Sequence, residues 1–339
     1  MSNPFSKIVE EAKGSGLKWP LMGLGVVLLF NLFFVDGFFA LEIRDGRLYG
    51  TLIDILNQGS KVMLLALGMT LVIATGGVDL SVGSLMAISG AIAAVMVTQT
   101  GVPIGGVFLV AVMVTFVLGC LNGGLVAVAG IQPIVATLIF MVAGRGIAML
   151  VTDGEIVTFE HAGFAQLGNG SWLGLPVTLF VVAGVFCIAV WVTRRTAVGL
   201  FIEAVGDNET ASRFSGVPNR LIKVLVYGSS GLFAGLAGLI AASNIKAADS
   251  SRVGEMMELD AIFAVVVGGT ALTGGRYSLF GSIIGALLIQ TLTTTMYSLN
   301  VPPSIAPVPK AIVIVLVCLL QSESFRKQMS GIFGRKASA

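Results

Sequence analysis

Long apolar stretches without a charged residue dominate the chain. Residues 80–144 contain no Asp, Glu, Lys or Arg, and the same holds for residues 161–193 and 277–309. A helix that crosses a bilayer needs about 20 apolar residues, so the first stretch alone has room for about three spans. Runs such as Val181–Val192 are continuously apolar, whereas the strands of a membrane β-barrel alternate apolar and polar positions. The pattern therefore predicts an all-α polytopic membrane protein.

Charged residues and turn residues divide this pattern into about ten transmembrane helices. We predict them near 20–40, 58–76, 80–98, 104–128, 132–151, 174–193, 221–245, 259–273, 279–298 and 307–321. The segment 259–273 is short for a span, which indicates a broken or tilted helix. All of them belong to one predicted transmembrane domain, residues 1–339, with a lead-in at 1–19, a loop at 194–220 and a tail at 322–339.

Basic residues gather on one side of this predicted topology. With residues 1–19 inside, 13 of the 20 Lys and Arg residues fall in cytoplasmic segments and four in external loops. Because cytoplasmic segments of membrane proteins carry an excess of Lys and Arg, we expect both termini in the cytoplasm. The lead-in lacks the short apolar core of a signal peptide. The net charge of +2 gives no indication of nucleic-acid binding.

The composition agrees with a membrane bundle. Hydrophobic residues make up 55% of the chain and charged residues 11%, against about 25% charged in soluble domains. The chain has 44 glycines, some of them in patterns that place small residues one helical turn apart. These patterns are Gly119-x-x-x-Gly123, Gly231-x-x-x-Gly235 and Gly281-x-x-x-Gly285. Such faces let helices approach closely, so they predict a compact bundle without indicating a substrate.

Two segments indicate an internal repeat. Residues 65–90 run as an apolar helix, a short polar break with Asp79, and a helix rich in small residues. Residues 235–269 have the same order, with a longer break and Asp260. In the predicted topology the first break is cytoplasmic and the second external, so the two halves would be inverted. Inverted repeats are typical of transporters that alternate access to a central site.

The chain shows no pattern of catalytic residues. It lacks a Gly-x-x-x-x-Gly-Lys-Ser/Thr phosphate loop, so ATP used for transport must be bound by another chain. The single histidine, His161, has no companion ligands, and no nucleophile–histidine–acid set is evident. The three cysteines are scattered through apolar runs. We therefore expect no metal, no cofactor and no enzymatic activity in this chain.

Asp79 and Asp260 are the acidic residues that flank apolar helices at the two breaks. Asp79 precedes Leu80 and Ser81 as an N-cap residue would, accepting N–H groups that the start of a helix leaves free. The alternative is proton or cation coupling, because an acidic group inside a membrane is costly and is often functional. The sequence favours capping. Arg145, alone in its span, is expected to be an interhelical strut or an anchor at the membrane surface.

The cytoplasmic loop Thr193–Pro218 has an ordered pattern. A helical piece that includes Gly199 is followed by a turn at Gly206–Asn208, where Asn208 is expected to cap a short helix from Glu209. A second turn at Ser215–Pro218 ends that helix. The pattern fits a rigid projection that docks into a soluble partner and an ordinary interhelical loop equally well.

At this loop the sequence resembles the permeases of bacterial sugar ABC importers of the ribose, xylose and galactofuranose class. The resemblance rests on four blocks, residues 68–91, 122–150, 196–217 and 258–288, and covers most of residues 50–320. The stretches IATGGVDLS, MVAGRGIAML and DGEIVTF are most similar to galactofuranose permeases. The resemblance implies a location in the bacterial inner membrane and import of a monosaccharide by alternating access. The alternative function is an ion-coupled secondary transporter of a small polar solute.

The resemblance also implies partners and a coupling site. The partners would be an ABC ATPase on the cytoplasmic face, a periplasmic sugar-binding protein, and a second permease chain that differs from this one, with a homodimer as the alternative. The segment Glu203–Gly216 would be the coupling helix that sits in a cleft of the ATPase. Its expected coupling residues are Glu203, Gly206, Asp207, Asn208, Glu209, Ala211, Ser215 and Gly216.

A path for a sugar requires hydrogen-bond donors and acceptors more than charges, because a sugar is neutral and rich in hydroxyls. Candidates that fall in or beside the predicted spans are Thr70, Asp79, Ser81, Ser84, Asn122, Gln132, Thr137, Asp260 and Gln290. Each polar side chain among them fits an interhelical hydrogen bond equally well, and such bonds contribute about 0.6–2 kcal/mol in membranes.

Overall fold

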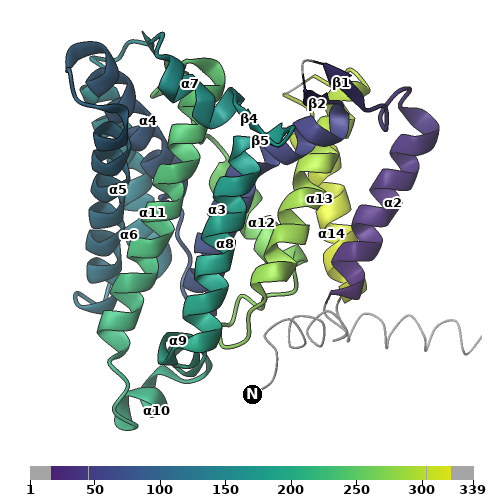
Figure 1. The fold of residues 1–339 in the computed structure, drawn as a ribbon. Coiled ribbons are helices and arrows are strands. Elements are labelled where there is room, and N and C mark those ends of the chain that lie inside the picture. The colour runs from purple at the N-terminus through teal and green to yellow at the C-terminus, as the bar shows by residue number, and fades with distance from the viewer. Residues whose placement is uncertain (1–16, 45, 303, 322–339) are drawn as a thin grey trace, which may run out of the picture.

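The computed structural model describes residues 17–44, 46–302 and 304–321, which fold into a bundle of helices with a few short strands (Figure 1). The helices are α2 (Lys18–Phe34), α3 (Thr51–Ala74), α4 (Val82–Gln99), α5 (Ile104–Ala127), α6 (Pro133–Val151), α7 (Ala162–Asn169), α8 (Val177–Arg195), α9 (Ala197–Asp207), α10 (Glu209–Phe214), α11 (Asn219–Ile245), α12 (Met257–Val267), α13 (Leu279–Ser298) and α14 (Pro307–Gln321). Most of the predicted lead-in and the whole predicted tail lie outside the described residues.

Seven helices of the described segments are long and apolar enough to cross a membrane, namely α3, α4, α5, α6, α8, α11 and α13. The apolar helices α2 and α14 are shorter, and α12 has 11 residues. The prediction of a polytopic helical membrane protein is confirmed. The structure also has a short helix where we predicted a broken one, although α12 ends at Val267 and not at residue 273.

Besides the end of α12, two predicted limits are wrong: α2 ends at Phe34 and not at residue 40, and α3 begins at Thr51 and not at residue 58. Its first turns contain polar residues that lowered the local hydropathy. The structure satisfies Asn57 among them: its amide donates to the Gly168 carbonyl at 3.3 Å and accepts from the Thr178 hydroxyl at 2.8 Å. A polar helix start is therefore stabilised by neighbouring elements that lie far along the chain.

The helices α3, α4 and α11 form the centre of the bundle. Their side chains are mostly buried, whereas α5, α6 and α8 expose most of theirs at the periphery. The core around α3 consists of aliphatic residues and methionines such as Leu64, Met69 and Ile73. Because the outer helices are apolar and exposed, they must be covered by lipid or by another membrane protein.

Glycines set the closest helix contacts, as the small-residue patterns predicted. A Cβ on Gly119 of α5 would meet the Gly228 and Gly231 backbone of α11, at 3.1 and 3.2 Å. On α13, a Cβ on Gly281 would collide with the backbone of Gly268, and one on Gly285 with the carbonyl of Ala264 in α12. These positions require glycine because backbone lies directly against them.

Two chain breaks enter the bundle from opposite ends and meet inside it. The first, residues 75–81, joins α3 to α4, and the second, residues 246–256, joins α11 to α12. Gly83 at the start of α4 lies so close to Gly254 in the second break that a Cβ on either would collide with the other's backbone. Gly254 also has a φ of 76°, a left-handed conformation that favours glycine.

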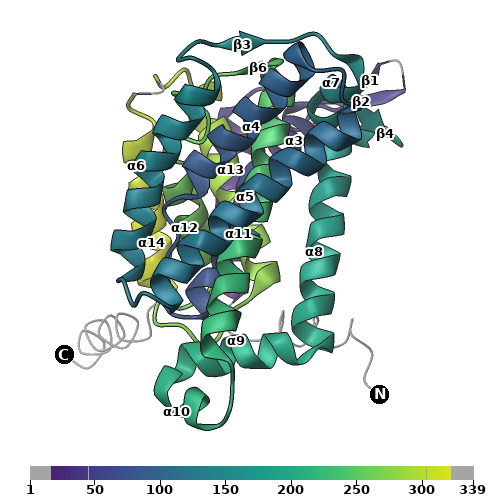
Figure 2. The same ribbon diagram turned by 90° about the vertical axis from the view of Figure 1, so that its left-hand side faces the viewer.

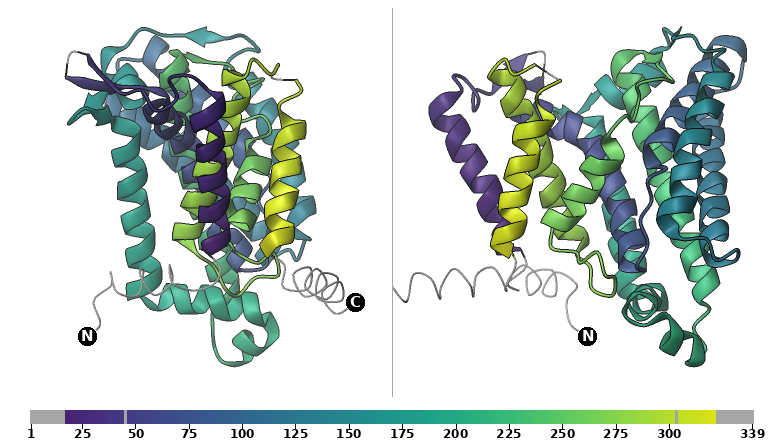
Figure 3. Two further views of the ribbon diagram at one scale, coloured as in Figure 1. Left: turned by 90° about the vertical axis from the view of Figure 1, so that its right-hand side faces the viewer. Right: turned by 180° about the vertical axis from the view of Figure 1, so that it is seen from behind.

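The two ends of the bundle differ. One end has α7 and three two-stranded sheets, in which β1 (Glu42–Arg44) pairs with β2 (Arg47–Tyr49), β3 (Val157–Thr158) with β6 (Ala247–Ala248), and β4 (Ser171–Trp172) with β5 (Leu175–Pro176). The other end has α9 and α10, and α9 lies across the ends of the long helices (Figures 1 and 2). Helix α2 begins and helix α14 ends at this same end of the bundle (Figure 3).

Candidate functional site

Asp79 is fully buried at the end of the first break, and its carboxylate binds groups from three elements. Oδ1 accepts from the Ser81 N–H at 3.0 Å and from the Ser81 hydroxyl at 2.6 Å. The other oxygen, Oδ2, accepts from the Ser230 hydroxyl of α11 at 2.8 Å. The Asn122 amide of α5 donates to the Ser81 hydroxyl at 3.1 Å and to Asp79 Oδ1 at 3.4 Å.

The predicted N-cap at Asp79 is wrong in position, because the N-cap residue of α4 is Ser81. Asp79 accepts the backbone N–H of that residue from two positions earlier in the chain. Its remaining bonds join the start of α4 to α5 and α11. The carboxylate therefore cross-links the centre of the bundle, in addition to satisfying a backbone group at the start of a helix.

Other predicted path residues also form hydrogen bonds inside the chain. Thr70 donates to Ser282 of α13 at 2.7 Å, and Ser84 donates to the carbonyl of Phe140 in α6 at 3.2 Å. Thr137 donates to Pro133 within its own helix at 2.9 Å. The polar residues with 0% exposure in the predicted set are Thr70, Asp79, Ser81, Ser84, Asn122 and Thr137. These residues form the interhelical or local hydrogen bonds that we gave above as the alternative to lining a sugar path.

The three remaining predicted path residues are less enclosed. Gln132 is exposed at the N-cap of α6, and Gln290 is half-buried on α13, where its amide donates to Thr294 at 3.4 Å. Asp260 on α12 forms an ion pair with Lys310 of α14, whose ammonium lies 2.9 and 3.0 Å from the two carboxylate oxygens. The structure therefore separates these three residues from the Asp79 cluster.

A set of charged residues lies on the side of the bundle made by α6, α12 and α14. Viewed from behind, α6 and α14 flank this side and α12 lies between them (Figure 3, right). Besides the Asp260–Lys310 pair, it includes Arg145 of α6, which donates to the carbonyls of Ser250 at 3.2 Å and Val253 at 2.6 Å. Arg145 is thus a strut, as predicted, but it holds the second break and not another helix. We call this side the charged face.

Two charged residues near this face were missed in the sequence. Glu258 is only 7% exposed in the first turn of α12, and a Cβ on Gly83 would collide with its carboxylate. Lys310 lies near the start of the predicted span 307–321, and no role was predicted for it. Both lie close to ends of short apolar helices, and that position was the signal available for finding them.

The second break is also ordered at its outer edge, away from the spanning helices. Asp249 accepts from the hydroxyl of Ser251 at 2.6 Å and from the N–H groups of Ser251 and Arg252 at 3.1 and 3.2 Å. These bonds, with the Ser251 hydroxyl first, hold the pKa of Asp249 below its usual value. The Thr152 and Ser250 hydroxyls lie 3.1 Å apart and connect the break to the end of α6.

The predicted helix–turn–helix in the loop after α8 is present as α9 and α10, which we call the connector. Asn208 caps α10 as predicted, since its side chain accepts from the Ala211 N–H at 2.9 Å. The Asn219 amide donates to the Glu209 carbonyl at 2.7 Å, and Lys223 pairs with the Glu209 carboxylate at 2.7 Å. Gly216 ends the turn with a φ of 85°, so the connector has a defined shape.

The connector presents a compact exposed tip. Phe214 at the end of α10 is 81% exposed, which is unusual for a large apolar side chain outside the membrane region. Glu203 is half-buried on α9. The predicted coupling residues that are exposed at the tip are Asp207, Asn208, Glu209, Ala211, Ser215 and Gly216.

The predicted turn at Gly206–Asn208 is wrong at its first residue. Gly206 lies within helix α9, and it does not have a positive φ. A Cβ there would collide with the carbonyl of Ala74 at the end of α3 and with the N–H of Gly275. The glycine is required because α9 lies directly on the backbone of the membrane bundle.

The described ranges contain no group of three or more His, Cys, Asp or Glu side chains that could hold a metal ion. His161 is the N-cap of α7, where Nδ1 accepts from the Phe164 N–H at 3.3 Å. Its role in the structure is therefore local.

Replacing Asp79 tests whether its carboxylate is structural. Asp79→Asn keeps one acceptor oxygen for Ser81 and gains an NH₂ group that can donate a hydrogen bond to the Ser230 hydroxyl. Uptake activity and melting temperature should therefore be largely kept. Asp79→Ala should lower stability, because each buried donor left unpaired costs about 1–3 kcal/mol. The control is Asp36→Ala, at an exposed aspartate. Melting of the purified protein and uptake in vesicles are measured; loss of uptake in a stably assembled Asp79→Asn variant contradicts the structural role.

Comparison with known proteins agrees with this architecture. The family described as branched-chain amino acid transport system / permease component matches residues 51–319. The chain is 47% identical over 324 residues to the galactofuranose transporter permease protein YtfT of Escherichia coli, covering 94% of each chain.

Two further similar proteins are also named as sugar import permeases. The fructose import permease protein FruF of Bifidobacterium longum is 38% identical over 339 residues, covering 98% of this chain and 95% of the relative. The ribose import permease protein RbsC of Haemophilus influenzae is 40% identical over 272 residues, covering 79% and 84%. The chain therefore belongs to this family of transport permeases, and its predicted membership of the ribose and galactofuranose class of ABC importer permeases is confirmed.

Proposed function

We propose that this chain is the membrane-spanning subunit of an ABC importer for a monosaccharide of the galactofuranose type. The observation that carries the proposal is the 47% identity to a galactofuranose transporter permease over 94% of both chains. The buried polar residues of the described bundle are neutral apart from Asp79 and Glu258, which agrees with transport of a neutral, hydroxyl-rich solute. An ion-coupled transporter is disfavoured, because the carboxylate of Asp79 is held by hydrogen bonds and that of Asp260 by Lys310.

The proposed topology has ten spans in the bacterial inner membrane, with both termini in the cytoplasm. The seven long helices, together with α2, α12 and α14, account for the ten spans. The connector marks the cytoplasmic end, because Arg194, Arg195 and Arg220 adjoin it and basic residues favour that side. The two breaks that meet at Gly83 and Gly254 support an inverted repeat built from α3–α4 and α11–α12.

A second permease chain covers the charged face in this proposal. Ionisable side chains inside a membrane face a protein interior or a water-filled path, because exposure to lipid is costly. The side chains of Asp260 and Lys310 are 21% and 15% exposed, and Arg145 is half-buried. The sugar path would run between the two chains along this face, with Gln132 at its cytoplasmic end. We propose a partner of different sequence, as the resemblance implies, with a second copy of this chain as the alternative.

ATP is bound and hydrolysed by a separate ATPase subunit, and this chain needs no cofactor of its own. The connector is the docking element for that ATPase, with Phe214 as its apolar anchor. Since α9 rests on Ala74 at Gly206, movement of the docked connector reaches the end of α3 directly. A periplasmic sugar-binding protein delivers the substrate to the opposite end, where α7 and the short strands lie.

Reconstitution tests the proposed function. The chain in liposomes with the ATPase, the second permease and the binding protein should import labelled galactofuranose only when ATP is enclosed, and unlabelled galactofuranose should compete better than ribose or fructose. The chain alone under a proton or sodium gradient should import none. Gradient-driven uptake by the chain alone would show a secondary transporter instead.

Shortening the Phe214 side chain should weaken docking of the ATPase without changing the stability of the permease. Phe214→Ala should reduce co-purification of the ATPase, because exposed aromatic anchors often contribute about 2 kcal/mol or more to an interface. The melting temperature of the free permease should not change, since the side chain is 81% exposed. The control, Ile43→Ala, removes an apolar side chain of similar exposure (75%) from the opposite end of the bundle. Normal ATPase recovery with Phe214→Ala argues against docking at the connector tip.

Enlarging the charged face should prevent assembly with the second permease. Val142 of α6 is 70% exposed and lies one helical turn from Arg145, so Val142→Trp places an indole between the chains. Recovery of the second permease with the tagged chain should fall, measured by mass spectrometry after mild solubilisation. Leu109→Trp, at a 64% exposed position of α5, should leave recovery unchanged. Equal recovery from both variants would place the partner elsewhere.

A further inference from the structure

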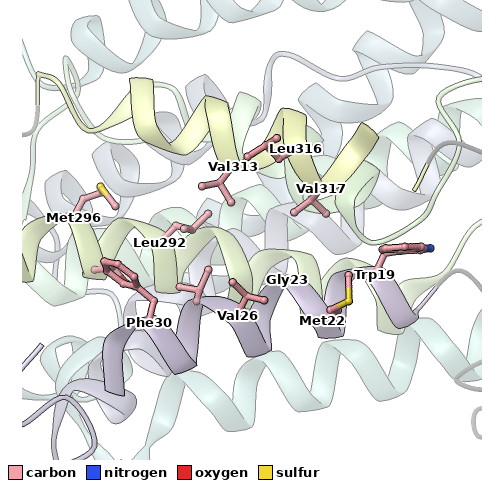
Figure 4. Close-up of a pocket in the computed structure, with 12 residues that line it drawn as sticks. Trp19, Met22, Gly23, Val26, Phe30, Leu292, Met296, Val313, Leu316 and Val317 are labelled. Atoms are coloured by element: carbon pink, nitrogen blue, oxygen red, sulfur yellow. The ribbon is translucent and has the colours of Figure 1, made fainter. Parts of the chain in front are cut away.

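An apolar groove lies on the outside of the bundle, between α2, α13 and α14 (Figure 4). Its volume is about 410 Å³. Its floor consists of Leu292 and Val317, which are buried, and of Gly23, where a Cβ would come within 2.9 Å of Leu288. Its rims are formed by more exposed side chains, among them Val26 and Leu316.

The groove offers no free hydrogen-bonding group to a ligand in its deep part. Thr295 is the polar side chain on its floor, and its hydroxyl already donates to the Thr291 carbonyl at 2.7 Å. It also accepts from the amide of Asn31 at 2.7 Å. A site without polar partners does not hold ordered water, so its occupant must be apolar.

The size and place of the groove limit the occupant further. All three helices belong to the apolar part of the bundle, so the groove opens to hydrocarbon, where an empty space would forfeit packing contacts. A helix with its side chains is about 10–12 Å across. A hydrocarbon chain is much thinner and can follow the groove along its length.

One end of the groove has the features of a membrane surface. Figure 4 shows Trp19 at this end, with Phe30 and Met296 at the other. Trp19 follows Lys18, an exposed basic residue at the first position of α2. Indole rings favour the headgroup level of a bilayer, and a lysine there attracts anionic headgroups. This end lies on the same side of the bundle as the connector (Figure 1).

We propose that the groove is a lipid-binding site, which holds one acyl chain of an anionic phospholipid whose phosphate lies near Lys18. The lipid comes from the leaflet on the connector side, which is the cytoplasmic leaflet under the topology proposed above. The bound chain fills the space between α2 and α14 and connects them through α13. Val26, Val313 and Leu316 contact the acyl chain, while Trp19 and Lys18 fix the depth of the headgroup.

Photolabelling of the assembled complex in nanodiscs tests the site. The probes are phosphatidylglycerol and phosphatidylcholine, each with a diazirine on one acyl chain, in a background of phosphatidylethanolamine. We expect phosphatidylglycerol to label Met22, Val26, Val313 and Leu316 in preference to Leu21 and Leu32, which lie on the opposite side of α2. Equal labelling on both sides of α2 would mean an ordinary lipid annulus and overturns the proposal.

Variants separate the acyl-chain contact from the headgroup contact. Val26→Phe combined with Val313→Phe fills the groove, and we expect loss of labelling there, whereas Leu32→Phe leaves it unchanged. Lys18→Gln should remove the preference for phosphatidylglycerol over phosphatidylcholine without moving the labelled residues. If a filled variant does not assemble, the distribution of label on the unaltered complex decides.

The other candidate occupants give distinct outcomes. Crosslinks from benzophenone at position 26 to a protein segment, either residues 1–16 or 322–339 of this chain or a helix of a partner, overturn the proposal. Crosslinks to lipid support it. The labelling requires no transport, so failure of the lipid site and failure of the proposed sugar import are observed separately.

Discussion

A helix that breaks inside a bilayer must find partners for its backbone groups within the protein, and this requirement governs the centre of the bundle. The break at 75–81 meets it through Asp79, whose carboxylate accepts the Ser81 N–H, and through Tyr227, whose hydroxyl donates to the Val78 carbonyl at 3.3 Å. Both partners of the break on α11, Tyr227 and Ser230, are themselves buried. Burying an acidic group in an apolar interior is costly, and the hydrogen bonds from Ser81 and Ser230 offset part of that cost.

The second break meets the same requirement, and its backbone lies against that of the first break. Arg145 donates to two carbonyls of the second break, and Thr152 contacts Ser250, so the polar groups of this segment also find partners inside the chain. Gly83 and Gly254 allow the two backbones to touch. The bundle therefore places two interrupted helices at its centre, each held by polar side chains from uninterrupted neighbours. Interrupted helices of this kind line substrate sites in many transporters.

The helices could be predicted because the length and apolarity of a span are local properties of the sequence. The predicted limits of α13 and α14, 279–298 and 307–321, agree with the structure, and those of α5 and α6 differ by one residue. The start of α3 was missed because the bonds of Asn57 to Gly168 and Thr178 are made more than 100 residues away along the chain. Hydropathy does not register such partners.

The site was predictable only in part for the same reason. A charge within the first break was visible at Asp79, but its partners Asn122 and Ser230 are 43 and 151 residues away. The capping of α10 by Asn208 was found because it is a contact over three residues. The ion pair of Asp260 with Lys310 spans 50 residues, and only the folded arrangement of α12 and α14 reveals it.

Gly206 joins the connector to the start of the first break and to the segment that follows α12. The residue lies against Ala74, the last residue of α3, and Ala74 accepts a hydrogen bond from the Gly275 N–H at 2.9 Å. Gly275 belongs to the segment between α12 and α13, and its neighbour Gly274 packs against Gly76 in the first break. The connector therefore touches the chain at the beginning of the first break and beyond the end of α12. Packed interiors transmit displacement because they have few voids. A force applied to α10 at the surface consequently reaches the end of α3 and the segment after α12 through Gly206, and it reaches α11 through the bonds of Glu209 with Asn219 and Lys223.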